Sequence, residues 1–421
     1  MENIHVNLIL TNKDLSPSSI SLTQCQSEEN AERDEESLQE SHYNLSGNSI
    51  SWGTSQDDQI KYEFDKIFPP DSSKKDIYHV VGCPIVPKLM DGINCTVVSF
   101  GNTHSGKRKT IYGDSTGKDE PFWSHDSYGN ICLSPKLGLL ARIAKDLWSQ
   151  IQQSVARTEV FVSFCNIHAG VHDLLDNYEG RKVRNLKEQM VEVQDLTRTR
   201  VSSFEEMMDV VGRGDKVLRN YGFKYNIGDS IYLTSNIIFT VYLKQNLYSN
   251  DGEIFVKDSR LELVSVQGNE ENPPRRGPQL EVKSLMKVIE ALTEPTKFVP
   301  YRNSSLTRIL SNSLNNNCSM YMLFHLSTHQ NCIEQGKTIL ELANRAKTIE
   351  QYPHPNEVNF TVRIAQLHVQ LAEIETAIRQ IKEEDDSERE LKRLEASRKE
   401  ISDAIKCVRQ EYANEMGTQH V

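Results

Sequence analysis

The stretch Cys95-Thr-Val-Val-Ser-Phe-Gly-Asn-Thr-His-Ser-Gly-Lys-Arg108 decides the fold. Its first part, Cys95 to Phe100, is an apolar run rich in β-branched residues and predicts a buried strand. The glycines follow directly, as in a loop between a strand and a helix whose backbone N–H groups bind phosphate oxygens. We therefore predict a phosphate-binding loop made of Gly101, Asn102, Thr103, His104, Ser105, Gly106, Lys107 and Arg108, in which Lys107 reaches the terminal phosphates of a nucleotide.

One position of this loop departs from the usual pattern. A loop of this kind needs Ser or Thr after its lysine, because that hydroxyl holds the magnesium ion of the nucleotide. The chain has Arg108 there. The sequence therefore predicts that the metal site is lost. Nucleotide binding without a metal, with the Arg108 cation near the magnesium position, remains open.

Composition narrows the class of protein. The chain has 421 residues, with 48 Lys and Arg against 59 Asp and Glu and a net charge of −11, which disfavours a general nucleic-acid-binding role. Its 8 cysteines form no Cys-x-x-Cys pair, as is usual in a reducing compartment. The chain has no basic leader and no apolar stretch near 20 residues, so we expect a cytoplasmic protein that is neither secreted nor membrane-spanning.

Patterning along the chain predicts an α/β domain over residues 1–351. Residues 12–58 are rich in Ser, Glu, Gln and Asn and predict a disordered polar insertion. Alternating strand and helix patterns elsewhere predict a mostly parallel or mixed sheet with helices on both faces. The predicted strands are Ile4–Leu10, Val160–Ile167, Ile237–Lys244, Arg260–Val266 and Met320–Leu326. The predicted helices are Lys136–Val155, Phe204–Val211 and Ile333–Ile349.

The C-terminal part predicts a linker and a coiled coil. Residues 352–357 contain Pro353 and Pro355 and predict the linker, and residues 358–415 carry apolar positions at spacings of three and four. These positions are Ile364, Leu367, Leu371, Ile374, Ile378 and Ile381, then Leu391, Leu394, Ile401, Ile405 and Val408. The phase break at residues 383–387 indicates either a stutter in one dimeric coiled coil or the turn of an antiparallel helical hairpin. We expect the dimer, with a second copy or with a different partner chain.

Several segments, in order, resemble the motor domain of kinesins. They cover most of residues 60–350, and the most specific is Val299–Leu314. The resemblance implies a P-loop NTPase motor fold, ATP as the nucleotide and microtubules as the partner. The matching segments are Tyr62–Phe68, Ile77-Tyr78, Asp91–Asn94, Phe100–Lys107, Ile238–Val241, Leu261–Val264, Val299–Arg302, Leu306–Leu310, Ser313-Leu314 and Asn344–Lys347.

The resemblance also implies which parts of the nucleotide site are missing. The family's paired switch serines align with Tyr232–Asn236, where one serine, Ser235, remains. The family's Asp-Leu-Ala-Gly-Ser-Glu motif aligns with Ser265–Glu270, which retains Gly268 and Glu270 but lacks the aspartate. In the family an arginine pairs with this glutamate, and the aligned residue in this chain is Thr234. We expect hydrolysis to be very slow or absent, because each lost preorganised group costs on the order of a hundred- to a thousandfold in rate.

Two further parts of the nucleotide site differ from the family. The Arg-x-Arg-Pro sequence that seats the base of the nucleotide corresponds to Ile9–Asn12, and the residue two beyond the loop lysine is Lys109. Neither segment supplies the family's usual side chains. The resemblance therefore predicts a weakened seat for the nucleotide base.

The track-binding side is better preserved. The resemblance places Arg302 and Arg308 where kinesins present basic residues to the acidic microtubule, although the family's lysine between them is Ser305. Lys283 and Lys287, with Arg275 and Arg276 upstream, add local positive charge in an acidic protein. Residues 268–288, which form the family's relay helix, are shortened and carry Pro273, Pro274 and Pro278, so we expect poor coupling of nucleotide to track.

The sequence around the linker predicts that the chain does not make a power stroke. A kinesin docks its linker beside an extension that precedes the first strand, but here the first strand begins within a few residues of Met1. Pro353 and Pro355 also remove backbone donors. The leading hypothesis is a kinesin-like microtubule-binding scaffold or regulator with weak or no ATPase activity. The alternatives are an active ATP-dependent motor and a coiled-coil adaptor that does not bind the track.

Overall fold

The computed structural model describes most of the chain in two compact units. Unit 1 lies within residues 1–152, 159–243 and 259–355, and unit 2 within 153–158, 244–258 and 356–421. The described residues are 1–11, 43–53, 59–102, 105–113, 123–127, 131–168, 170–185, 190–224, 235–248, 254–267, 279–294, 298–314, 317–328, 333–384 and 388–417.

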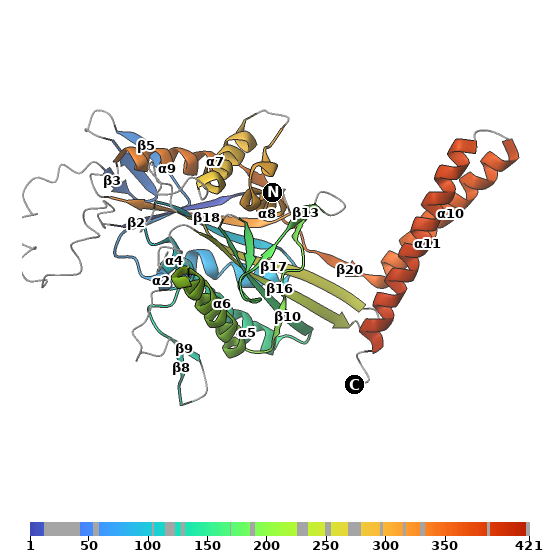
Figure 1. Cartoon of the computed structure of the whole chain (residues 1–421), viewed down its shortest axis with the longest axis horizontal. Helices are drawn as coiled ribbons and strands as arrows, with labels where there is room; N and C mark the ends of the chain where they lie inside the picture. Colours follow the sequence, from blue (N-terminus) through green and yellow to red (C-terminus); the bar gives the residue numbers. More distant parts are fainter. Residues whose placement is uncertain are drawn as a thin grey trace, which may run out of the picture. The chain divides into compact units, whose positions relative to one another are not determined.

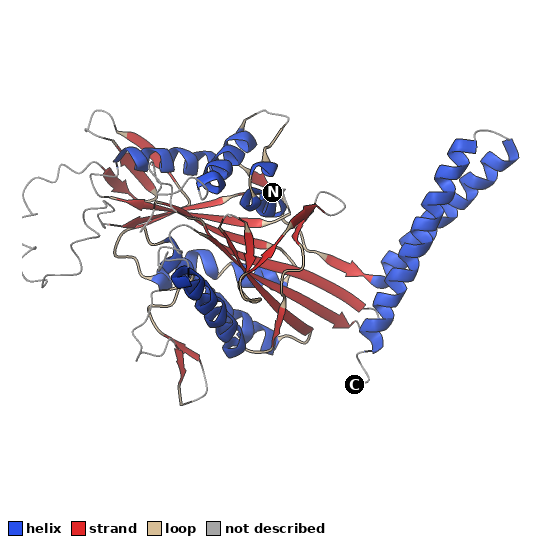
Figure 2. Cartoon of the chain, viewed as in Figure 1, coloured by secondary structure: helices blue, strands red, loops and turns tan. Residues whose placement is uncertain are grey.

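A mixed sheet forms the centre of unit 1 (Figure 2). Its strand order is β12-β11-β10-β16-β17-β7-β18-β2-β6, and β15 also pairs with β10. The run from β17 through β7, β18 and β2 to β6 is parallel, whereas β10, β11, β12 and β15 pair antiparallel. The bounds are β2 (His5–Thr11), β6 (Lys66–Phe68), β7 (Cys95–Gly101), β10 (Arg157–Ile167), β11 (Val171–Asp173), β12 (Glu179–Arg181), β15 (Thr199–Val201), β16 (Asn236–Tyr248), β17 (Ile254–Ser265) and β18 (Ser319–Ser327).

Helices cover both faces of this sheet (Figure 1). Neighbouring residues of β7 face opposite layers, so Val97 packs in one buried cluster and Val98 in the other. The first layer contains α2 (Lys74–Ile77), η1 (Tyr78–Gly82), α3 (Ile85–Met90), α5 (Leu139–Gln153) and α6 (Phe204–Lys224). The second contains α7 (Gln279–Thr293), η4 (Tyr301–Asn303), α8 (Ser305–Leu314) and α9 (Ile333–Ala346). The predicted α/β fold with helices on both faces is confirmed.

All the predicted strands and helices of this domain exist, with differences in length. The largest concerns α6, which continues to Lys224 although the sequence predicts an end at Val211. Gly212 and Gly214 lower helix propensity at that point. Gly214 is needed because a Cβ there would lie 2.3 Å from Cδ1 of Phe164 on β10. Close packing on the sheet therefore outweighs the local cost of glycine.

Part of the predicted polar insertion must be corrected. Residues 43–53 form β3 (Tyr43–Ser46) and β4 (Ser49–Trp52), which join β5 (Ile60–Glu63) in a small antiparallel sheet. Ile50 and Trp52 alternate with serines and are buried in the second layer. That alternation was the signal for a strand, and the surrounding polar composition masked it. Residues 12–42 and 54–58 of the predicted insertion lie outside the described residues.

A short strand lies directly before the predicted linker, residues 352–357. The sequence predicts no strand partner for the linker ahead of β2, but β1 (Glu2–Asn3) pairs antiparallel with β19 (Glu350–Gln351). Gln351 is fully buried, and its Nε2 donates to the carbonyl oxygen of Ser313 on α8 at 2.9 Å. A short strand therefore does precede β2, but it pairs with the two residues directly before the linker. Within residues 352–357, Glu357 is paired, as the first residue of the strand Glu357–Asn359.

Unit 2 contains a helical hairpin. β20 (Glu357–Asn359) pairs with residues 255–257 of β17, and the chain continues as α10 (Phe360–Glu384) and α11 (Glu388–Gly417), which pack antiparallel (Figure 1). Val256 and Phe360 form a buried cluster against which Val408 packs. Leu367, Ile378 and Ile405 are buried, and Arg409 donates to Nε2 of His368 at 3.0 Å. Of the two arrangements that the sequence left open, the structure has the hairpin. Dimerisation stays a prediction.

Candidate nucleotide site

The predicted phosphate loop lies at the carboxyl end of β7 and leads into α4 (Lys107–Ile111). Its two glycines adopt φ angles of 149° at Gly101 and 92° at Gly106, which residues with a side chain rarely adopt. A Cβ at position 101 would also lie 2.3 Å from the carbonyl oxygen of His325. Thr103 and His104 lie outside the described residues. Gly101, Asn102, Ser105, Gly106, Lys107 and Arg108 lie where the sequence predicts the loop.

The loop closes around its own lysine. Lys107 is only 7% exposed, and its Nζ donates to the carbonyl oxygen of Asn102. The same oxygen accepts a hydrogen bond from Oγ of Ser105 at 2.7 Å. The side-chain amide of Asn102 donates to Oε1 of Gln335 on α9 at 2.8 Å. The Lys107 cation is therefore held inside the loop by a backbone dipole.

A buried histidine on β18 contacts both the strand before the loop and the helix after it. Nε2 of His325 lies 3.0 Å from Oγ1 of Thr110 on α4, and Nδ1 lies 3.3 Å from Oγ of Ser99 on β7. Burial, with a smaller contribution from the nearby Lys107 cation, lowers the pKa of His325 to about 3, so the ring is neutral near pH 7. The sequence did not point to this residue as part of the site. Its signal was a histidine inside the apolar run Met320–Leu326.

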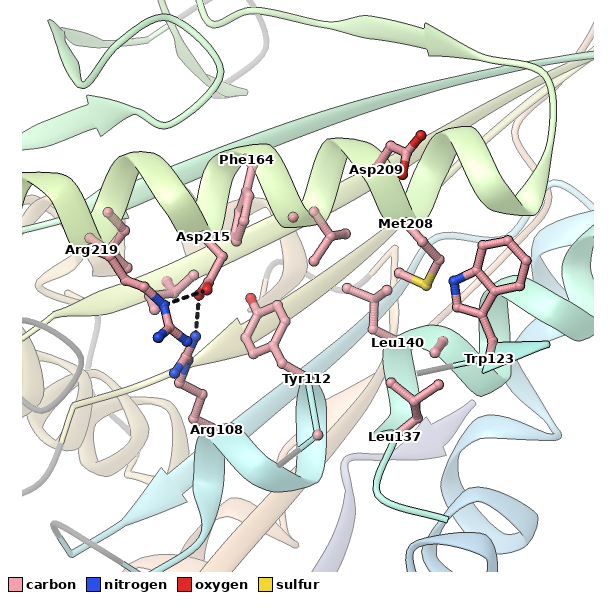
Figure 3. A pocket seen from close by; sticks show the side chains of 16 residues that line it. Arg108, Tyr112, Trp123, Leu137, Leu140, Phe164, Met208, Asp209, Asp215 and Arg219 are labelled. Atoms are coloured by element: carbon pink, nitrogen blue, oxygen red, sulfur yellow. Dashed lines mark hydrogen bonds and ion pairs between the residues drawn. The ribbon is translucent and has the colours of Figure 1, made fainter. Parts of the chain in front are cut away.

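Arg108 is directed toward α6 by an ion pair (Figure 3). Its Nη2 pairs with Oδ1 of Asp215, and Oδ2 of Asp215 accepts from Nε of Arg219 at 3.0 Å. The Arg108–Asp215–Arg219 cluster therefore connects the loop to the middle of α6. Sequence reasoning singled out Arg108 but could not find Asp215, because the two residues are 107 positions apart.

The same cluster forms part of the wall of a cavity of about 290 Å³. The rest of the wall is mainly apolar and includes Tyr112, Trp123, Leu140 and Met208 (Figure 3). Trp123 belongs to a two-stranded sheet of β8 (Trp123–His125) and β9 (Ile131–Leu133), and its ring meets Phe204 of α6 edge-on at 5.5 Å. The cavity thus lies between α5, α6 and the loop helix.

The switch positions are only partly described. Tyr232–Thr234, Gly268 and Glu270 lie outside the described residues. Ser235 is buried, and its Oγ has no hydrogen-bond partner among the described residues. Asn236 is also buried, and its Oδ1 accepts from the backbone N–H of Gln267 at 3.1 Å. This bond connects the two switch segments at their bases, where β16 begins and β17 has just ended.

The four predicted track-binding residues divide into two groups. Lys283 and Lys287 are exposed on α7, and Arg302 is exposed in η4. Arg308 on α8 is half-buried instead, and its Nη2 donates to the carbonyl oxygen of Val183 and to Oδ1 of Asn185, both at 3.0 Å. It thereby holds the hairpin of β13 (Val183–Asn185) and β14 (Val191–Val193). Track binding by Arg308 stays a prediction, for a side chain that already has partners within the chain. Arg275 and Arg276 lie outside the described residues.

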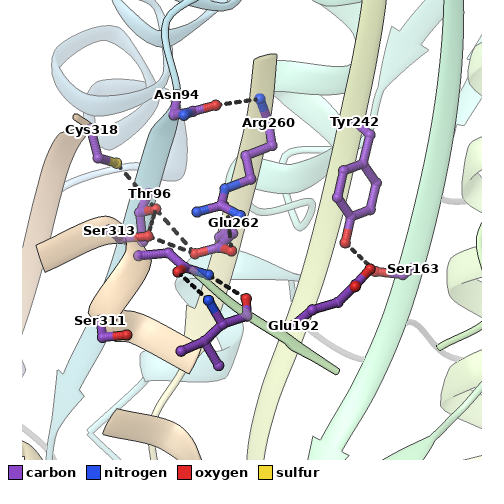
Figure 4. A network of polar contacts seen from close by, with 12 residues as sticks. Asn94, Thr96, Ser163, Glu192, Tyr242, Arg260, Glu262, Ser311, Ser313 and Cys318 are labelled. Carbon is purple, nitrogen blue, oxygen red and sulfur yellow. Dashed lines mark hydrogen bonds and ion pairs between the residues drawn. The ribbon is translucent and has the colours of Figure 1, made fainter. Parts of the chain in front are cut away.

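A second polar network lies at the other end of β7 (Figure 4). Glu262 on β17 is 5% exposed, and Oγ of Ser313 donates to its Oε2 at 2.8 Å. Oγ1 of Thr96 donates to Ser313 at 2.8 Å, and Nε of Arg260 lies 3.7 Å from Oε1 of Glu262. The network partners this buried carboxylate and attaches α8 to the sheet. It stands apart from the phosphate loop, and sequence reasoning missed it.

Within the described residues, no helix is both long and apolar enough to cross a membrane, and no group of three His, Cys, Asp or Glu side chains could hold a metal ion. The described cysteines form no disulfide bond with one another: Cys83, Cys95, Cys132, Cys165, Cys318 and Cys407.

Comparison with known proteins agrees with this geometry. A family model described as the kinesin motor domain matches residues 22–349, and the chain belongs to this family. It is similar to the kinesin-like protein Klp61F of Drosophila melanogaster, with 27% identity over 314 residues, and to the kinesin-like protein KIN-5A of Arabidopsis thaliana, with 31% identity over 316 residues. Each match covers 70% of this chain but only 28% and 29% of the respective relative. The chain therefore spans less than a third of the length of these relatives.

A solved structure described as that of a fast kinesin has the same fold. The two superpose with a TM-score of 0.68 at 24% identity, over 85% of this chain and 94% of that chain. At that level of identity the likeness establishes the fold alone. The motor fold predicted from the sequence is thereby confirmed.

The residues of the loop fit a phosphate group but not its usual metal. Lys107 and the glycine loop suit phosphate oxygens, and Oγ of Ser235, which has no partner within the described part of the chain, is a further polar group in a switch segment. The metal-binding hydroxyl, in contrast, is replaced by a guanidinium that pairs with Asp215. A cation in this position repels a magnesium ion and offers it no lone pair.

Proposed function

We propose that the chain is a microtubule-binding kinesin-family protein whose phosphate loop takes ATP without magnesium and turns it over very slowly or not at all. One observation carries this proposal: Arg108 occupies the position of the metal-binding hydroxyl and forms an ion pair with Asp215. The nucleotide site thus lacks the group that neutralises charge in phosphoryl transfer, whereas exposed basic residues remain on α7 and η4.

Weak turnover follows from the loss of positioning. Phosphoryl transfer depends almost entirely on charge neutralisation and alignment, so the protein has little other chemistry to offer. When ATP binds, Lys107 and the loop N–H groups would hold its phosphates, and Ser235 could donate from the switch side. No aspartate stands at Ser265 to support a metal. The expected turnover is slower than that of an intact site by at least about a hundredfold.

Track binding rests on exposed charge. Lys283 and Lys287 are four residues apart on α7, so they project from the same face of the helix. They stand out in a chain whose net charge is −11. Such a surface attracts an acidic lattice such as the microtubule, and this attraction weakens as salt screens it. We infer a cytoplasmic protein associated with the microtubule cytoskeleton.

Self-association is a further part of the proposal. In the hairpin of α10 and α11, Ile364, Leu371, Ile374 and Ile401 are only partly buried. Pairing with another hairpin, from a second copy or from a partner chain, would cover them. Sedimentation of the full chain over a range of concentrations tests this point.

An active motor is the second candidate, and one observation favours it. Strand pairing flanks the linker: β19, directly before it, pairs with β1, and β20, which begins at its last residue Glu357, pairs with β17. Strand pairing of the linker is what the family uses to dock it. The prolines lie between these two segments and do not prevent either pairing.

Microtubule-stimulated ATP hydrolysis by the full chain, with co-pelleting measured in the same tubes, separates these functions. Salt-sensitive pelleting without turnover supports the proposed function. Robust stimulated turnover would show an active motor and overturn the argument from Arg108. Failure to pellet at low salt would favour the adaptor that does not bind the track.

A further inference from the structure

We propose that Asp215 of α6 controls the phosphate loop by competing with a bound polyphosphate for the guanidinium of Arg108. The ligand class is a metal-free polyphosphate, such as ATP or tripolyphosphate. This inference rests on the proposed nucleotide site, but it concerns a residue that neither the loop motif nor the family resemblance points to. Asp215 is a positioning residue in this scheme, because it acts only through Arg108.

The position of Arg108 allows it to serve two partners. It directly follows Lys107, so its backbone belongs to the first turn of α4, next to the loop. Side chains of a helix lean toward its N-terminus, so the loop lies within the range of directions that the Arg108 side chain can take. In the structure, the guanidinium instead pairs with Asp215 (Figure 3). A change of side-chain rotamer is enough to exchange one anionic partner for another.

The charges of the cluster favour such an exchange. Asp215 accepts from both Arg108 and Arg219, so two guanidinium groups share one carboxylate. Arg219 can therefore keep Asp215 neutralised when Arg108 leaves. A guanidinium binds phosphate oxygens as well as carboxylate oxygens, through parallel N–H donors. The Arg108 and Asp215 side chains are only 30% and 26% exposed, which limits the screening of their attraction by water.

The scheme predicts the effect of removing the competing carboxylate. In Asp215→Asn, Arg108 loses its charged partner on α6 and becomes available to the phosphates. We expect ATP binding in EDTA to tighten by about tenfold. Arg108→Thr alone should change this affinity by less than about twofold, because in the natural chain Asp215 holds the guanidinium. In the double variant the gain should disappear, which makes the coupling measurable by a double-mutant cycle.

The experiment is calorimetric titration of the full chain with ATP and with tripolyphosphate, both in EDTA. Asp209→Asn is the matched control, since Asp209 lies on the same helix and lines the same cavity, and its removal changes the net charge equally. Equal tightening in Asp209→Asn, or a gain that survives in the double variant, would overturn the proposal. So would unchanged affinity in Asp215→Asn. Asp215→Ser serves as a second variant if Asp215→Asn unfolds.

The two levels of inference fail differently. If the natural chain binds ATP and Asp215→Asn binds it with the same affinity, the proposed competition between Asp215 and the phosphates is refuted, but the proposed nucleotide site is still supported. If none of the variants binds ATP or tripolyphosphate, the loop is not a phosphate site and both ideas fall. Microtubule pelleting tests the track-binding part independently.

Discussion

The phosphate loop and the outer side of α7 each carry two basic side chains but use them in opposite ways. In the loop, Lys107 is 7% exposed and donates to the backbone of Asn102, while Arg108 pairs with Asp215. On α7, Lys283 and Lys287 are exposed to solvent. Inward-directed cations organise the chain itself, and outward-directed cations are available to a partner.

The difference has a simple electrostatic reason. A cation that leaves water loses its hydration and must regain that free energy from nearby dipoles or anions. The loop therefore holds its cations in internal contacts, with which any ligand must compete. An exposed lysine keeps its hydration and contributes mainly a long-range field. Burial, rather than residue type, decides which basic residues are free to bind.

The largest expected effect on stability comes from adding a side chain at Gly101, where the loop backbone lies against β18. Gly101→Val would place side-chain atoms against the backbone of His325 and force a side chain into a φ of 149°. We expect the free energy of unfolding in urea to fall by about 4 kcal/mol. Gly180→Val is the control, because a Cβ at position 180 would meet no atom within 4 Å. Similar losses in the two variants would argue against a tightly supported loop.

The hairpin of unit 2 tests the same contrast between inward and outward residues. Replacing either of the buried residues Leu367 and Ile405 by alanine should destabilise α10 and α11 by about 3 kcal/mol, because the change leaves a cavity. Hydrogen exchange of the two helices in the full chain would report the loss of protection. Val369→Ala should have little effect, since Val369 is 59% exposed. Protection that rises with protein concentration would instead indicate that a dimer stabilises the helices.

The buried histidine predicts a pH dependence of stability. The pKa of His325 falls from 6.5 to about 3 on folding, so between these values the unfolded chain binds a proton that the folded chain does not. Its contribution is therefore complete above pH 6.5 and is lost as the pH falls toward 3. At pH 5 the loss should be about 2 kcal/mol.

Urea unfolding at pH 5 and pH 7.5 measures this loss of stability. His325→Gln should remove that part of the difference between the two pH values, whereas the exposed His79 should not matter when changed to glutamine. An unchanged pH dependence in His325→Gln would show that the histidine is protonated, or accessible, in the folded chain.

The smallest expected effect concerns the outward-directed lysines. Lys283→Glu with Lys287→Glu should weaken microtubule binding by about tenfold, with a smaller difference at high salt. Arg213→Glu with Lys216→Glu on α6 is the matched control, because both residues are exposed and the charge change is the same. Equal weakening in both pairs would mean that net charge, and not the α7 surface, governs binding.

Prediction from sequence succeeded where the signal was local. The run Cys95–Phe100 is apolar and β-branched, and it forms the buried strand β7 with the loop directly after it. The heptad positions around Leu367 and Ile405 likewise predicted helices that exist. Prediction was weaker where neighbours decide the outcome. The sequence predicted an end to α6 at Val211, just before Gly212 and Gly214, and polar neighbours concealed β4.

The residues of the site also divide into those that the sequence could predict and those that it could not. Arg108 could be recognised as a departure from the loop pattern, because the motif spans consecutive residues. Its partner Asp215, the supporting His325 and the internal bonds of Arg308 could not, since hydrogen bonds and ion pairs join residues by distance in space and not along the chain.

Local patterning was thus enough to predict the order of strand, loop and helix and to show Arg108 where the loop pattern has Ser or Thr, because these depend on side-chain chemistry over a few consecutive residues. The resemblance of ordered segments predicted the family. Only the folded chain decided where each charge points: Arg108 to α6, Arg308 to β13, and Lys283 and Lys287 to solvent. It also decided that the two apolar seams pack in one hairpin. These outcomes depend on desolvation and packing between distant segments, which no window of sequence contains.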